Sequence, residues 1–182
     1  MIWYEKGPFT VFDVETTGRS PVYDRIVEIA ALRIEKDGSE SRFSTLINPG
    51  RRIPYTASRI HHITNDMVVT APRFEDIAQD FMEFISGSIL AAHNARFDLS
   101  FLQESLARCG MMPWEGDTMD TLRLVRSVYP GLPSYKLQEL RFTLDLGCES
   151  GSAHRAGADV EWTAVLLKKT LSFLIEAQNK GL

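Results

Sequence analysis

The sequence contains little of what a secreted or membrane protein needs. Only 2 of its 182 residues are cysteines, and Cys109 and Cys148 show neither CxxC nor Cys/His spacing, which argues against a disulfide framework and a zinc site. No apolar run approaches the roughly 20 residues that span a bilayer. Residues 1–6 lack the basic region and apolar stretch of a secretion signal. We therefore expect a soluble, cytoplasmic protein without a membrane partner.

An excess of positive charge is also missing. The 20 Lys and Arg residues are outnumbered by 24 Asp and Glu residues, which gives a net charge of −4. A protein that holds long duplexes by counterion release relies on a broad basic surface, so that class is disfavoured. A protein that grips only a strand end is still allowed, because bound divalent cations can hold its phosphates.

Linkers, internal repeats and low-complexity segments are absent as well. With 44% hydrophobic and 24% charged residues, the chain has enough apolar material for one core. We expect a single domain over residues 1–182.

The pattern of apolar residues indicates an α/β fold. Short β-branched and apolar runs predict strands at 9–14, 26–34, 42–47 and 89–92, and Lys36, Asp37 and Gly38 predict a tight hairpin between the second and third. Spacings of three and four residues predict helices at about 74–85, 97–110, 122–128, 136–144 and 156–177, while 59–66 reads as loop. The first three strands are expected to be antiparallel.

Acidic residues stand at positions that an ordinary core would not favour. Asp13 and Glu15 are two apart at the end of an apolar strand, so both side chains point to one face, without Lys or Arg in the strand to pair with them. Asp98 lies in the first turn of a predicted helix, where the helix dipole favours an acid whatever its function. Asp159 shares a helical stripe with Leu166, Thr170 and Phe173, which predicts that it faces inward.

Each of these features has an ordinary structural explanation when it is taken alone. Strand-end carboxylates can face water, and His154 follows a loop rich in small residues that could simply be solvated. Histidine is nevertheless the side chain best suited to take a proton from water near neutral pH.

Taken jointly, three segments resemble the motifs of the DnaQ-like, DEDDh family of 3′–5′ exonucleases. They are D-V-E-T-T-G at 13–18, H-N-A-R-F-D at 93–98 and H-R-A-G-A-D at 154–159, in this order over most of the chain. His154 indicates the DEDDh branch, since a sister group has a tyrosine four residues before the final acid.

The resemblance implies an RNase H-like fold, with a five-stranded mixed sheet, helices on both faces and a fifth strand near Met119. It also implies two divalent cations, Mg²⁺ or Mn²⁺, which are hard ions that prefer oxygen ligands. Asp13 would bridge both ions, Glu15 and Asp159 would complete the site of the attacking water, and Asp98 would hold the second ion. His154 would remove the proton of that water.

The resemblance further implies contacts with the terminal nucleotide by Thr16, Thr17, His61, Asn94 and Phe97. Residues 60–64 resemble the family segment V-H-G-I-T, but His62 replaces the glycine. If that glycine is required for a positive φ angle, the conformation around His61 should differ from the family's.

The predicted function is a metal-dependent 3′–5′ exonuclease that releases nucleoside 5′-monophosphates from single-stranded or frayed 3′ DNA ends, in proofreading or repair. A replicative DNA polymerase is the expected protein partner. Two alternatives remain: an RNA-trimming exonuclease of the same superfamily, since the motifs do not encode tolerance of the 2′-hydroxyl, and a non-catalytic module that serves as a nucleic-acid-binding or polymerase scaffold.

Overall fold

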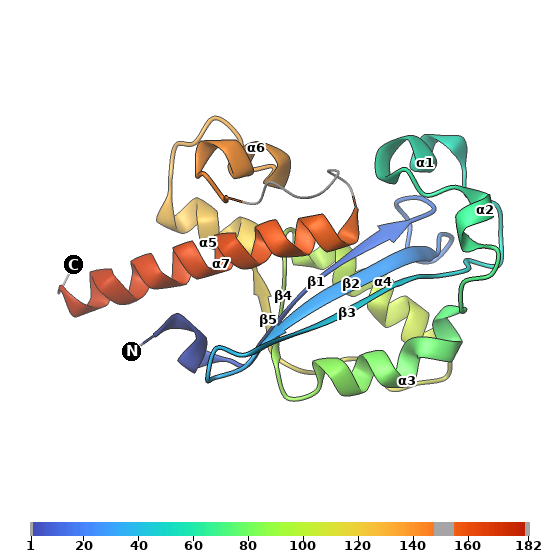
Figure 1. The fold of residues 1–182 in the computed structure, drawn as a ribbon, viewed down its shortest axis with the longest axis horizontal. Coiled ribbons are helices and arrows are strands. Elements are labelled where there is room, and N and C mark those ends of the chain that lie inside the picture. Colours follow the sequence, from blue (N-terminus) through green and yellow to red (C-terminus); the bar gives the residue numbers. More distant parts are fainter. Residues whose placement is uncertain (1, 148–154, 181–182) are drawn as a thin grey trace.

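A five-stranded mixed sheet forms the centre of the computed structural model, which describes residues 2–147 and 155–180 (Figure 1). The strand order is β3-β2-β1-β4-β5. β2 is antiparallel to β1 and β3, whereas β4 is parallel to β1 and β5. The strands are β1 (Phe9–Thr16), β2 (Ile26–Ile34), β3 (Glu40–Leu46), β4 (Ile89–Ala92) and β5 (Thr118–Asp120). The predicted sheet and its antiparallel beginning are confirmed.

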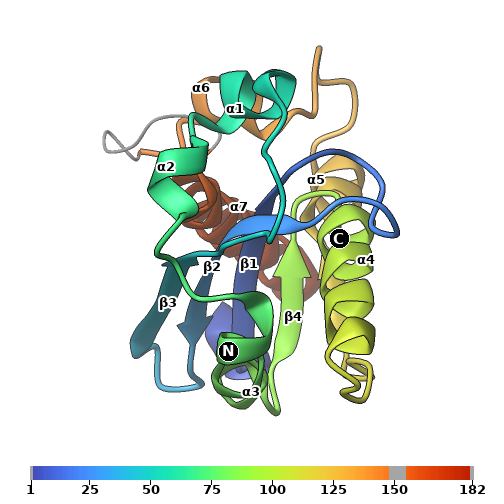
Figure 2. The ribbon, with the colours of Figure 1, turned by 90° about the vertical axis from the view of Figure 1, so that its right-hand side faces the viewer.

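Helices cover both faces of the sheet (Figures 1 and 2). α7 lies along one face, over β1 and β2, and α3 and α4 pack on the other. The short helices α1 and α2 lie beyond the end of β1. After the 3₁₀ helix η1 (Trp3–Lys6), the helices are α1 (Tyr55–His61), α2 (Asn65–Val68), α3 (Phe74–Ile85), α4 (Ala95–Arg108), α5 (Thr121–Val128), α6 (Leu137–Thr143) and α7 (Ala156–Asn179).

The alternation of side chains along β1 decides where its acids point. Phe12 and Val14 belong to the core beneath α3 and α4, whereas Phe9 and Val11 belong to the core beneath α7. Asp13 and Glu15 continue the second series, because residues two apart share a face of a strand. Both acids therefore face the side of the sheet that α7 covers.

Most predicted elements lie within two or three residues of the observed ones, but the segment 59–66 was wrongly predicted as loop. It contains the end of α1 and the start of α2. These helices are too short for their apolar residues to form a clear stripe, and Tyr55 and Ile60 of α1 are exposed. On α7, Leu166 and Thr170 are buried as predicted, whereas Phe173 is 48% exposed.

Within the described residues, no helix has the length and apolar character to cross a membrane.

Candidate active site

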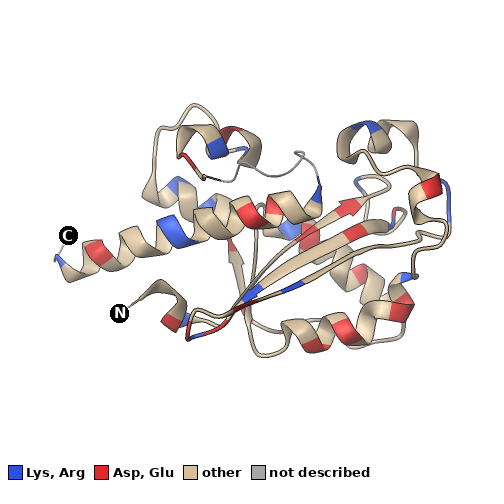
Figure 3. Cartoon of the chain, in the orientation of Figure 1, with Lys and Arg blue, Asp and Glu red and all other residues tan. Residues whose placement is uncertain are grey.

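Three carboxylates meet where the end of β1 approaches the first turn of α7. Oxygen atoms of Asp13, Glu15 and Asp159 all lie within 4.8 Å of one another. Figure 3 shows acidic positions on both elements at this point. Asp159 is only 8% exposed, as its predicted inward orientation requires. Residues far apart in the sequence are thus brought together by the packing of α7 on the sheet.

Asp98 reaches the same region from the other side of the sheet. It lies in the first turn of α4, is 3% exposed, and its Oδ1 accepts a hydrogen bond from the Val14 amide at 3.1 Å. Val14 separates Asp13 from Glu15, so this bond fixes the Asp98 carboxylate against the strand that carries the other two. Asp98 is not one of the three residues whose oxygens lie within 4.8 Å of one another.

The proximity and burial of these acids disfavour their charged forms. Burial, followed by the charges of Asp98 and Asp159, raises the pKa of Asp13 well above its usual value. Burial and the charge of Asp159 raise the pKa of Glu15 to about 8. Burial raises the pKa of Asp98 to about 7, although the Val14 amide opposes this shift.

A cluster of this kind fits hard divalent cations. All of its donors are carboxylate oxygens, which Mg²⁺ and Mn²⁺ prefer. Burial and, after it, the charges of the neighbouring acids raise these pKa values, and positive charge between the acids would favour their ionised forms. The residues present therefore fit divalent metal ions of this kind.

Sequence reasoning missed an ion pair beside the cluster, in which the acid is buried and the Arg155 side chain is partly exposed. Glu28 of β2 lies opposite Glu15 in the strand register and is 4% exposed. Its carboxylate binds the Arg155 guanidinium at 2.6 Å and accepts a hydrogen bond from the Ala156 amide at 3.0 Å. The pair anchors the first turn of α7, and hence Asp159, to the sheet. An acid in an apolar strand was the available signal.

A second missed residue is Gln138 on α6. Its amide Nε2 donates a hydrogen bond to Asp159 Oδ1 at 2.9 Å. Nothing in the sequence indicates this contact, because the placement of α6 relative to α7 follows from packing around Leu140 and Trp162.

Four of the five expected nucleotide contacts line one cavity of about 420 Å³ that opens beside Glu15. They are Thr16, Thr17, His61 and Phe97. The threonine hydroxyls serve local structure, since Thr16 Oγ1 donates to Gly18 O at 2.6 Å and Thr17 Oγ1 accepts from the Arg25 amide at 3.0 Å. Phe97 gives the cavity an aromatic wall, and aromatic rings hold bases with little sequence preference.

His61 contributes a buried nitrogen to this cavity. Its Nδ1 accepts a hydrogen bond from the Ile63 amide at 3.0 Å, so the ring proton resides on Nε2. Nε2 lies near the Thr16 backbone and is buried without a well-formed hydrogen bond to any described residue. Burial lowers the pKa of His61, which favours the neutral ring.

His62 adopts the conformation for which the family uses glycine. Its φ angle is 62° and it caps the C-terminus of α1 in the left-handed region. A positive φ angle is rare for a residue other than glycine, so glycine would be tolerated at this position of the chain.

Asn94, the fifth expected contact, lies on a different cavity of about 730 Å³, which Asp13 and Asp159 also line. Asn94 has a φ angle of 71° at the start of α4, and its backbone N–H donates a hydrogen bond to Asp120 Oδ1 at 3.2 Å. Asp120 also caps α5 by accepting from the Leu122 amide at 2.9 Å. The carboxylates thus stand between two cavities.

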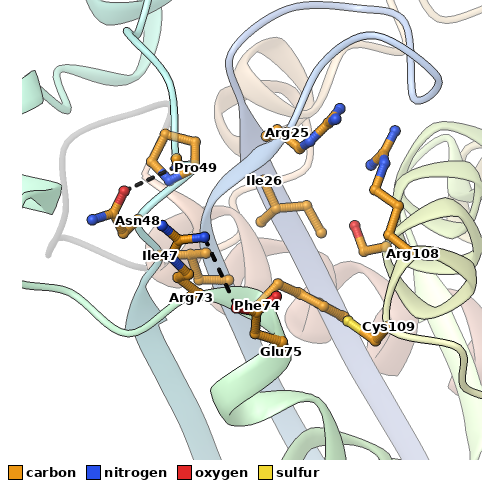
Figure 4. Close-up of a pocket in the computed structure, with 12 residues that line it drawn as sticks. Arg25, Ile26, Ile47, Asn48, Pro49, Arg73, Phe74, Glu75, Arg108 and Cys109 are labelled. Atoms are coloured by element: carbon orange, nitrogen blue, oxygen red, sulfur yellow. Dashed lines mark hydrogen bonds and ion pairs between the residues drawn. The ribbon is translucent and has the colours of Figure 1, made fainter.

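A third, smaller cavity of about 140 Å³ lies between the start of β2, residues 47–50, the start of α3 and the end of α4 (Figure 4). Arg25 and Arg108 stand side by side on one rim, and Arg73 stands on the other. None of the predicted site residues lines it. Arg108 supports the connection from β1 to β2, because it donates to Val22 O at 2.8 Å.

His154, the predicted general base, lies outside the described residues. Its role therefore stays a prediction from the sequence motif, as do the individual metal-binding roles of the four acids.

Comparisons with known proteins agree with the geometry. Residues 10–167 match the RNase T family, described as exonuclease. The chain is 44% identical over 156 residues to DNA polymerase III subunit epsilon of Treponema pallidum, which covers 86% of this chain and 73% of that protein. It is 38% identical to the 3′-5′ exonuclease DinG of Bacillus subtilis, with 93% of this chain but only 18% of that protein covered.

Among solved structures, exonuclease X in complex with 5′ overhanging duplex DNA is 31% identical, with a TM-score of 0.71 and coverage of 90% of this chain and 91% of that one. The expected RNase H-like architecture is thereby confirmed. The match over most of the sequence and the identity to the epsilon subunit lead to one conclusion: this chain belongs to the RNase T exonuclease family, whose DnaQ-like members its motifs resemble.

Proposed function

We propose that this protein is a metal-dependent 3′–5′ exonuclease that removes nucleoside 5′-monophosphates from single-stranded or frayed 3′ DNA ends, in proofreading or repair. The observation that carries this proposal is the cluster of Asp13, Glu15 and Asp159, with Asp98 fixed against the same strand, between two cavities. A non-catalytic binding module would have no physical need to hold these acids together, because their ionised forms repel one another.

In this proposal, Asp13, Glu15, Asp98 and Asp159 hold two divalent cations, Mg²⁺ or Mn²⁺. Bound cations of this kind increase the acidity of the attacking water and neutralise charge that develops on the leaving 3′-oxygen. Arg155 and Gln138 orient the acids, since one anchors the start of α7 to Glu28 and the other donates to Asp159.

The remaining residues bind the strand end and move one proton. Phe97 contacts the terminal base and His61 Nε2 donates to the terminal nucleotide, while Thr16 and Thr17 shape the cavity that receives it. Asn94 contacts the strand from the other side of the carboxylates. His154 accepts the proton of the water that attacks phosphorus.

A degradation assay with matched DNA and RNA oligonucleotides tests the proposal. With Mn²⁺, the parent should shorten 5′-labelled single-stranded DNA one nucleotide at a time from the 3′ end and release 5′-monophosphates. Preferential degradation of the RNA would favour an RNA-trimming enzyme, and the proposal would be overturned if both oligonucleotides remained intact.

Because a relative that is 44% identical is a polymerase III subunit, we also propose that a replicative polymerase is a partner of this protein. Co-purification with the catalytic subunit of that polymerase would test this.

A further inference from the structure

The two cavities beside the carboxylates differ in the cations that line them. The 730 Å³ cavity that contains Asp13 and Asp159 is also lined by Arg126 of α5 and by Lys136, which precedes α6 and lies 3.9 Å from Glu139. The 420 Å³ cavity has apolar walls of Ala57, Ile60 and Phe97 and one cation, Arg19. All three cations are exposed, and two of them line the cavity that contains Asp13 and Asp159.

Arg126 is held in place without being neutralised. Its guanidinium lies 5.3 Å from the centre of the Tyr135 ring. Tyr135 is itself fixed, because its hydroxyl donates to Tyr129 O at 2.9 Å and accepts from the Leu132 amide at 3.2 Å. Across residues 2–147 and 155–180, no carboxylate forms an ion pair with Arg126. A fixed, unpaired guanidinium on a cavity wall suits an anionic ligand.

The chemistry of a strand end assigns that ligand. A 3′-terminal nucleoside carries no phosphate except the one that is cleaved, so an apolar cavity suits it. Every nucleotide on the 5′ side of the cleaved bond adds a phosphodiester, which needs positive charge. We propose that Arg126, assisted by Lys136, binds the backbone phosphates immediately 5′ of the cleaved bond, so that the strand crosses the carboxylates from one cavity to the other. This inference rests on the proposed exonuclease function.

Substrates with and without upstream phosphates test it. The p-nitrophenyl ester of thymidine 5′-monophosphate has one phosphodiester and nothing upstream, whereas a single-stranded 20-mer has a full backbone. In Arg126→Ala we expect kcat/KM for the 20-mer to fall at least tenfold further than kcat/KM for the ester, mainly through KM. Lys136→Ala should show the same selectivity with a smaller loss.

Arg123→Ala is the matched control, because Arg123 is an exposed arginine on the same helix that does not line the cavity. It should change neither substrate's kinetics more than twofold. Equal losses on both substrates in Arg126→Ala would assign Arg126 a structural role through Tyr135 and overturn the inference. Unchanged kinetics on both substrates would also overturn it.

Binding measurements separate this inference from the proposed function. In an Asp13→Asn background, removal of Arg126 should reduce the slope of log Kd against log salt concentration for the 20-mer by about 0.7, the value for one phosphate contact on a single strand. An unchanged slope would contradict the inference even if the parent is an exonuclease. A parent that hydrolyses neither substrate would instead refute the proposed function, whatever the slope.

Discussion

Glu15 and Glu28 face each other across β1 and β2, yet their surroundings are opposite. Glu28 is bound by the Arg155 guanidinium and by the Ala156 amide, so its charge is compensated within the protein. An oxygen of Glu15 lies within 4.8 Å of oxygens of Asp13 and Asp159, and burial together with the charge of Asp159 raises its pKa to about 8. Two acids on neighbouring strands thus have different surroundings: Glu28 is paired with a cation of the protein, whereas the charged form of Glu15 is disfavoured.

The comparison teaches that burial alone does not identify a functional acid. Glu28 is as buried as Asp98, but its partner is a side chain of the protein. Asp13, Glu15 and Asp159 are instead grouped with one another, an arrangement that is found more often at functional sites than in an ordinary core. Substitutions in the carboxylate cluster should therefore affect mainly activity, whereas substitutions in the Glu28–Arg155 pair should affect mainly stability.

The largest expected effect concerns activity. Asp13→Asn should lower kcat by roughly a thousandfold or more, because it removes a charge from the proposed metal site. The metal-free protein should melt at the same or a higher temperature, since one repulsive charge is lost. Oligonucleotide degradation and thermal unfolding in EDTA are the measurements. Near-parental hydrolysis by this variant would remove Asp13 from the site.

The opposite result is expected at the ion pair. Arg155→Met leaves the Glu28 charge buried without its partner, which should lower the free energy of unfolding by about 3 kcal/mol. The double variant Glu28→Gln/Arg155→Met should recover much of that loss, as urea unfolding can measure. If the single variant unfolds at the parental midpoint, the pair does not anchor α7.

The pH dependence of stability should sharpen the contrast further. The folded-state pKa of Glu15, about 8, is above the ordinary value of 4.5, so folding favours the protonated acid. Its contribution to stability is complete below about pH 4.5 and is lost as the pH rises through 8. Melting curves of the metal-free parent should therefore show a loss of stability between pH 5 and 8 that is smaller in Glu15→Gln.

Cation binding should offset that loss. Addition of Mn²⁺ at pH 8 should stabilise the parent by about 2.7 kcal/mol when its concentration is 100 times Kd. An unchanged melting temperature at millimolar Mn²⁺ would mean that the cluster does not bind the ion.

The smallest effect is expected at Asp159, whose carboxylate accepts a hydrogen bond from the neutral Gln138 amide. Gln138→Leu should weaken metal affinity or activity by about tenfold, as the loss of a partner that orients a ligand commonly does. Gln138→Glu should be measured beside it. Because it adds a negative charge next to Asp159, it should make the Mn²⁺ dependence of activity change more steeply with pH. Mn²⁺ titrations of activity measure both, and parental values for the leucine variant would exclude an orienting role.

Much of this fold could be predicted because β1 and β2 are rich in apolar residues and α7 is long. The cluster could be predicted because its motifs stand at the ends of those elements. The Glu28–Arg155 pair could not, since Arg155 stands at the start of α7, far away in the sequence, and only the packing of α7 on β2 brings it to Glu28. Gln138 was also beyond prediction, because only the packing of α6 on α7 brings it to Asp159.

The position of Asp13 and Asp159 near opposite ends of the polypeptide has a mechanical consequence. An ion held between them would tie β1 to α7 and close a loop of most of the sequence, so it would act as a reversible cross-link. Closing long loops restricts the unfolded chain most. Binding of the ion should slow the detachment of α7 from the sheet. If the chain were cleaved between β1 and α7, the bound ion should help to hold the two fragments together.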